Sequence, residues 1–99
     1  MAKVALIVDF QLKPGTWEQF DPIIRAHAAG TKQDEPGCEQ FDVLQPEIDG
    51  KPDHSRVMLV EVYKDEAAFA IHAASQRLVN TRAAYADLIE GRTISRCSV

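Results

Sequence analysis

Short apolar runs separated by polar and turn-forming residues predict a chain of alternating strands and helices. The run "KVALIVDFQL" favours a strand, because every second residue from Val4 to Phe10 is apolar and these residues share one face. After the turn "KPGT", apolar residues recur at helical spacing, which predicts a helix over residues 17–32. Thr16 precedes Gln19 by three residues, the spacing of a capping box at the start of that helix.

The rest of the chain continues the same alternation. A Pro-Gly turn precedes a predicted strand over residues 38–45, residues 46–53 indicate a hairpin loop, and "SRVMLVEVY" predicts a third strand. Asp65 is placed to cap a helix over residues 66–74. A further helix is expected to end near Gly91, and the last strand, "RTISRC", follows it. One side of this helix carries Leu78, Arg82, Tyr85 and Ile89.

The third strand shapes the predicted architecture most strongly. The order strand-helix-strand-strand-helix-helix-strand is that of the α+β, ferredoxin-like (split β-α-β) fold, an antiparallel sheet with helices on one face. Such a sheet should alternate apolar and polar residues, yet Met58, Val60 and Val62 are as apolar as Val57 and Leu59 on the opposite face. We therefore expect a homodimer in which a second subunit's sheet covers the face that the helices leave open.

Composition restricts the class of protein. The chain has 99 residues, which predicts a single domain over residues 1–99. Its net charge of −4 and the lack of a basic run argue against a nucleic-acid partner. The segment "VALIVDF" is too short to span a membrane, so we expect no membrane partner and a cytoplasmic location. No P-loop, dinucleotide-binding glycine motif or HExxH occurs, which predicts no tightly bound metal, flavin or haem.

Three segments carry a resemblance to a known family. "FQLKPGTWEQF", "DEPGCEQFDV" and "VEVYKDEAAFAIH" follow one another in an order and at distances that resemble the antibiotic biosynthesis monooxygenase domain. The resemblance covers nearly the whole chain and implies a dimeric α+β barrel with a pocket between the sheet and the helices of one subunit. Some members oxygenate phenols or hydroquinones to quinones with dioxygen and without a cofactor. Some relatives isomerise a small phosphorylated sugar, and others degrade haem.

Glu61 and His72 form the candidate catalytic pair. A carboxylate inside an apolar strand is costly unless it is paired or hydrogen-bonded. His72 shares a helix face with Phe69, and an imidazole, with an ordinary pKa of about 6.5, suits a general base. Two interpretations remain open: the pair handles protons in a pocket, or the two side chains only stabilise the fold.

Several further residues are candidates for the site. Tyr63 shares a strand face with Glu61 and can donate a hydrogen bond to a phenolate. Arg82 lies in an apolar helix face, where it either pairs with Glu61 or faces a cavity and favours an anionic substrate. His27, at the end of an apolar stripe, and His54, in a polar loop, receive no definite role. The apolar wall that a flat ring needs is assigned to the aromatic residues Trp17, Phe20, Phe41 and Phe69.

The resemblance leads to one functional hypothesis and two alternatives. Dioxygen reacts poorly with a neutral phenol, whereas a deprotonated ring can pass it one electron. His72 would remove the proton with support from Glu61, and Tyr63 would hold the oxyanion. The alternatives are an isomerase of a small polar or phosphorylated metabolite and a ligand-binding dimer without activity. A flat apolar pocket touching His72 would favour the oxygenase, and an arginine-lined polar pocket the isomerase.

Overall fold

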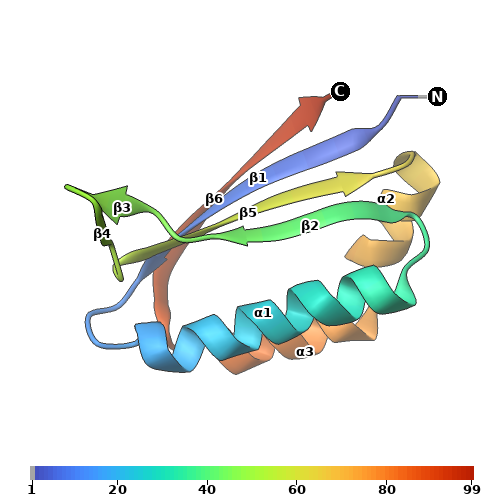
Figure 1. Ribbon diagram of the computed structural model, residues 1–99. Coiled ribbons are helices and arrows are strands. Elements are labelled where there is room, and N and C mark those ends of the chain that lie inside the picture. Colours follow the sequence, from blue (N-terminus) through green and yellow to red (C-terminus); the bar gives the residue numbers. More distant parts are fainter. Residues whose placement is uncertain (1) are drawn as a thin grey trace.

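The computed structural model describes residues 2–99, which form an antiparallel sheet with helices against one face (Figure 1). The elements in chain order are β1 (Val4–Leu12), α1 (Trp17–Asp34), β2 (Cys38–Leu44), β3 (Glu47–Ile48), β4 (Lys51–Pro52), β5 (Arg56–Tyr63), α2 (Glu66–Ala73), α3 (Gln76–Tyr85) and β6 (Ile89–Ser98). The predicted order and fold class are confirmed. The predicted loop over residues 46–53 additionally contains the short β3–β4 hairpin.

The main sheet interleaves the two halves of the chain. Its strand order is β2-β5-β1-β6, and every neighbouring pair is antiparallel. This is the arrangement of the split β-α-β fold. α1 and α3 lie side by side against one face, and α2 lies at one end of the same layer (Figure 1). None of the helices in this described part of the chain is long and apolar enough to cross a membrane.

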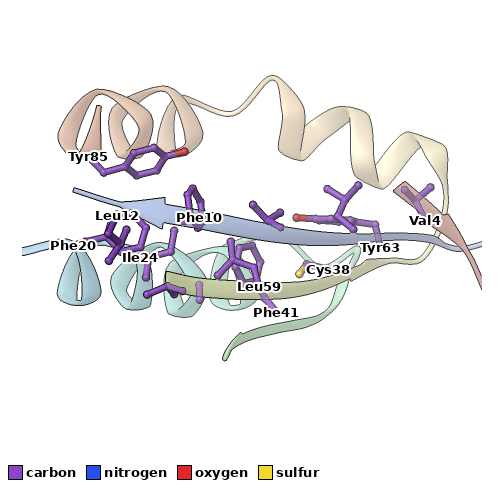
Figure 2. Packing of buried hydrophobic residues seen from close by; sticks show 14 of the residues in the cluster. Val4, Phe10, Leu12, Phe20, Ile24, Cys38, Phe41, Leu59, Tyr63 and Tyr85 are labelled. Atoms are coloured by element: carbon purple, nitrogen blue, oxygen red, sulfur yellow. The ribbon is translucent and has the colours of Figure 1, made fainter. Parts of the chain in front are cut away.

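The buried face of the sheet is set by the register between β1 and β5. Leu6 pairs with Glu61, so alternate residues of both strands point under the helices together. Phe10 packs on this face against Phe20 of α1 and Tyr85 of α3, with ring centroids 5.0 and 5.3 Å apart (Figure 2). These aromatic contacts hold α1 and α3 against one end of the sheet. The region around Glu61 is covered by α2 and by other side chains.

The opposite face of the sheet is also apolar at its centre. Ile7 of β1 pairs with Val60 of β5, and their side chains point away from the helices with Met58 and Val62. All four side chains are only partly exposed in the single chain. β5 therefore presents apolar residues to both sides, as the alternation of its sequence predicts.

One predicted helix cap and one predicted helix end are wrong, although α1 begins at Trp17 as predicted. The Thr16 side chain makes no capping bond to α1, because its hydroxyl donates instead to backbone carbonyls, including that of Leu88 at 2.8 Å. α3 ends at Tyr85 rather than near Gly91. The backbone N–H of Leu88 bonds the carbonyl of Tyr85 at 2.9 Å, and the chain then enters β6 at Ile89. Pairing with β1 therefore extends the last strand into residues that sequence periodicity assigned to the helix.

The cap of α2 is as predicted and can be tested. Asp65 accepts a hydrogen bond of 2.8 Å from the backbone N–H of Ala68, which satisfies one free donor of the first turn. Asp65→Ala should lower the free energy of unfolding by ~1 kcal/mol, whereas Asp65→Asn, which keeps an acceptor, should lower it by only a few tenths. Urea denaturation of the three proteins measures both values. Equal losses in the two variants would contradict a capping role.

Candidate active site

A cavity of about 130 Å³ lies between the sheet and the helices. Its walls are mainly apolar and include Leu6, Phe10, Ile24, Leu59, Phe69 and Ile94. Ionisable side chains also reach it from α1, β5, α2, α3 and β6, namely His27, Glu61, His72, Arg82 and Arg92. The cavity therefore combines an apolar space with groups that can bind or move a proton.

Glu61 is buried because of its place in the alternation of β5. It points under the helices, opposite Leu6 of β1 and Phe41 of β2, and the residue is 4% exposed. Tyr63, two residues further along the same face, donates its hydroxyl to Glu61 Oε1 at 2.6 Å. This hydrogen bond provides part of the solvation that the carboxyl group loses on burial.

His72 lies between two carboxyl groups that come from different parts of the chain. Its Nδ1 atom is 3.1 Å from Oε1 of Glu35, which follows α1 directly. Its Nε2 atom is 3.8 Å from Oε1 of Glu61, which is too long for a hydrogen bond. A carboxylate only accepts hydrogen bonds, so the bond to Glu35 places the ring hydrogen on Nδ1. The lone pair of Nε2 is then available to a further partner.

Burial controls the ionisation of this cluster. It raises the pKa of Glu61 to about 7, against the smaller opposing effects of the Tyr63 hydroxyl and the Arg82 charge. Burial and the adjacent Glu61 carboxyl raise the pKa of Tyr63 far above its usual value, so the phenol stays protonated. The pKa of His72 is lowered by burial, which outweighs the opposing charge of Glu35. At neutral pH the imidazole is therefore uncharged and Glu61 is close to its titration point.

His27 is a second buried imidazole beside the first. The centroids of the His27 and His72 rings are 5.6 Å apart, and His27 Nδ1 lies 3.0 Å from the Thr81 hydroxyl of α3. Burial, reinforced by His72 and nearby arginines, lowers the pKa of His27 to about 4. It is a neutral polar group of the cavity. Within residues 2–99, no three His, Cys, Asp or Glu side chains are grouped so as to hold a metal ion.

The structure brings only some of the predicted site residues together. Phe69 and Arg82 line the cavity with Glu61 and His72, and no ion pair joins Arg82 to Glu61 in the described part of the chain. Tyr63 is fully buried, with its hydroxyl directed to Glu61 rather than into the cavity.

The other three predicted wall residues lie outside the cavity lining. Phe20 is 0% exposed in the core, and Phe41 packs against the rings of His27 and His72. Trp17 stacks on His54, with ring centroids 4.0 Å apart, near the β3–β4 hairpin. Trp17 and Phe20 therefore contribute to the packing of the fold, and Phe41 packs beside the two imidazole rings.

Sequence reasoning missed Glu35, Thr81 and Arg92. Glu35 stands beside the Pro-Gly turn, where a polar residue is ordinary, and nothing local indicates that this turn reaches α2. Thr81 occupies the same helix face as Leu78 and Tyr85, a spacing that could have indicated it. Arg92 belongs to a strand whose pairing partner the sequence does not reveal.

Residues 3–84 match the antibiotic biosynthesis monooxygenase family. The chain belongs to this family. The resemblance carried by the three sequence segments is thereby confirmed, and the match includes β1, α1, β5 and α2, which supply most of the cavity. A search of curated proteins found no match to the sequence.

Solved structures share the fold along nearly the whole chain. A Nitrosomonas europaea protein that bears the family's name is 28% identical with a TM-score of 0.86, over 98% of this chain and 89% of that one. A Caulobacter crescentus protein that bears the same name is 17% identical with a TM-score of 0.90, over 99% and 90%. A Pseudomonas aeruginosa protein is 22% identical with a TM-score of 0.87, over 100% and 95%. These likenesses establish the α+β fold for this family member.

The raised pKa of Glu61 predicts how stability depends on pH. The folded state holds this proton up to about pH 7, whereas the ordinary pKa of a free glutamate is 4.5, so the folded chain loses stability as pH rises between these values. Glu61→Gln stays uncharged and keeps an acceptor for Tyr63. The free energy of unfolding of Glu61→Gln minus that of the wild type should therefore rise by ~2 kcal/mol from pH 5 to pH 8.

Denaturant unfolding at several pH values measures this difference, and the exposed Glu47→Gln serves as the matched control. The control should run parallel to the wild type across the range. A constant offset between Glu61→Gln and the wild type would mean that Glu61 is already ionised at pH 5.

Proposed function

We propose that the chain is a cofactor-independent monooxygenase that oxidises a phenol or hydroquinone to a quinone with dioxygen. The observation that carries this proposal is the setting of His72. Its Nδ1 atom is hydrogen-bonded to Glu35 at 3.1 Å, whereas its Nε2 atom lies 3.8 Å from Glu61, too far for a hydrogen bond. The residue also lines an apolar cavity. A neutral imidazole held in one tautomer beside an apolar space suits removal of a proton from an aromatic hydroxyl.

The dimensions of the cavity support a substrate with one aromatic ring. Its volume of about 130 Å³ is close to the ~150 Å³ of an apolar protein cavity that binds benzene. Apolar walls such as Leu59 and Phe69 match the faces of a flat ring. Substituents larger than a hydroxyl group would have to extend toward solvent.

In the proposed first step, Nε2 of His72 takes the proton of the substrate hydroxyl. The imidazolium that forms keeps its Nδ1 hydrogen on Glu35, whose negative charge stabilises the new positive charge. Glu61 lies beside Nε2 and has a pKa of about 7, so it can share the proton and return it later. Tyr63 acts through Glu61 by holding that carboxyl group in place.

The substrate supplies every electron that dioxygen requires. The phenolate passes one electron to dioxygen, and the two radicals then combine to form a C–O bond at an unsubstituted ring carbon. When the O–O bond breaks, one oxygen atom stays as a quinone carbonyl. The other leaves as water with the hydrogens of the substrate's hydroxyl and ring carbon. A phenol and dioxygen thus give a quinone and water, so the reaction needs no external reductant and depends on positioning and exclusion of solvent.

A second candidate function is an isomerase of a small anionic metabolite, and Arg82 is the observation that favours it. Arg82 lines the same cavity as His72. The same base could move a proton between two carbon atoms while the guanidinium group holds the anion. This reaction consumes no oxygen, which separates it from the first proposal.

We also propose that the chain forms a homodimer through the open face of the sheet. The centre of that face carries Ile7, Met58, Val60 and Val62, which are apolar and partly exposed. Contact with the same face of a second copy would cover them, and a stable interface of this kind buries at least ~1,200 Å² in total.

The dimer is tested by placing a charge at its centre. Val60 points away from the helices, so Val60→Lys should dissociate the dimer while leaving the fold intact. Val79→Lys, at a 57% exposed position of α3, is the matched control and should remain dimeric. Light scattering at micromolar concentration measures the mass, and circular dichroism checks folding. A wild-type mass of 11.0 kDa, that of one chain, would contradict the proposal.

The role of His72 is tested by oxygen uptake. With a panel of hydroquinones, His72→Ala should slow uptake by ~10²–10⁴, the usual contribution of a general base. His54→Ala removes an exposed imidazole outside the cavity and should react at the wild-type rate. All rates are compared at equal folded fraction and in the presence of a chelator. Equal rates for wild type and His72→Ala would remove this residue from the mechanism, and no uptake by any protein would favour the isomerase or a binding role.

A further inference from the structure

The arginines of the chain fall into two groups. Four of the six form ion pairs with carboxylates, and the other two, Arg82 and Arg92, form none within residues 2–99. The four pairs are Arg25–Asp21, Arg56–Asp9, Arg77–Asp34 and Arg96–Glu66. The two arginines without a carboxylate partner are also the two that line the cavity.

Both arginine side chains line the cavity because of their positions on the elements that carry them. Arg82 shares a face of α3 with Leu78 and Tyr85, at spacings of four and three residues, and all three line the cavity. Arg92 of β6 pairs with Phe10 of β1, which places its side chain on the helix side of the sheet. Its Nη1 atom donates a hydrogen bond of 2.7 Å to the Tyr85 hydroxyl, which fixes the group beside the cavity.

The protein itself does not neutralise these two charges. Of the described residues that line the cavity, Glu61 alone is acidic, and it lies 4% exposed with its oxygen bound to Tyr63. Burial raises the pKa of Glu61 to about 7, so it carries on average about half a charge near that pH. Glu35, the other acidic group beside His72, lies outside the cavity lining, so among the lining residues the two arginines face only this fraction of a negative charge. The positive charge at Arg82 and Arg92 favours an anionic occupant.

Exposure differs among the residues that line the cavity. Ile24, Leu59 and His72 are 1, 2 and 4% exposed, whereas Arg82 and Arg92 are exposed. In the pose that we infer, a ring presents its hydroxyl group to the buried His72 and its far edge to the exposed arginines.

We propose that the substrate is a hydroxylated single-ring carboxylate, whose carboxylate group is bound by Arg82 and Arg92 while its hydroxyl group meets His72. This inference rests on the proposed function for the position of the reacting hydroxyl. The planar guanidinium group matches a carboxylate through two parallel N–H donors, which gives such a pair both strength and orientation. The neutral hydroquinones would then be slower substrates that lack one of the two attachment points.

A binding measurement tests this inference independently of catalysis. Calorimetric titration compares 4-hydroxybenzoate with its neutral counterpart 4-hydroxybenzamide on the wild type and on the double variant Arg82→Gln/Arg92→Gln. The carboxylate should bind the wild type about ten-fold more tightly than the amide or better, the worth of a charged hydrogen-bonded contact. That preference should vanish in the double variant and persist in Arg25→Gln, which alters an arginine outside the cavity. Thermal melts confirm that each variant is folded.

Equal affinity of the wild type for the two probes, or a preference that survives the double substitution, would overturn the inference. The double variant Arg82→Lys/Arg92→Lys keeps both charges and should retain part of the preference, which identifies a charge effect rather than loss of packing. Oxygen uptake with 2,5-dihydroxybenzoate and hydroquinone is measured separately. A carboxylate preference in binding without uptake would support the anion site and refute the oxygenase. Uptake of oxygen with both substrates at equal rates, without a binding preference, would support the oxygenase and refute the anion site.

Discussion

Burial of the Glu61 carboxyl group in the apolar face of β5 is the constraint on which the rest of the site depends. A carboxylate in such surroundings costs several kcal/mol unless it is hydrogen-bonded or protonated. Both apply to Glu61, which accepts a 2.6 Å hydrogen bond from Tyr63 and whose pKa burial raises to about 7. A group that titrates near neutral pH beside a neutral imidazole is what proton transfer at that pH requires.

The fold makes this arrangement possible by joining distant segments. Glu35 follows α1, His72 lies on α2, and Glu61 lies on β5, so the cluster forms only when both helices are packed on the sheet. The aromatic packing of Phe10 and Phe20 fixes one end of that layer (Figure 2). Phe10 also lines the cavity, so the packing that holds the helices on the sheet forms one wall of the candidate site. Stability and the candidate chemistry therefore share the interface between sheet and helices.

Much of the fold follows from local patterns, whereas the site depends on contacts that local patterns do not encode. The alternation of β5 correctly predicted that Glu61 and Tyr63 share one face, which the structure places under the helices, and Asp65 correctly marked the start of α2. Glu35 gave no such signal, because its partnership with His72 spans 37 positions. Trp17 and Phe20 were assigned to a ligand wall because aromatic residues suit both cores and pockets. Only the packing of α1 decides which of the two they serve.

The most direct test of this account is a measurement of the ionisation of Glu61 and His72 by heteronuclear NMR. The side-chain carboxyl carbon of Glu61 is followed from pH 4 to pH 9, and the ring nitrogens of His72 report charge and tautomer over the same range. We predict a Glu61 midpoint near 7 and an uncharged His72 at pH 7 with its hydrogen on Nδ1. A Glu61 midpoint near the ordinary value of 4.5, or an imidazolium at pH 7, would contradict it.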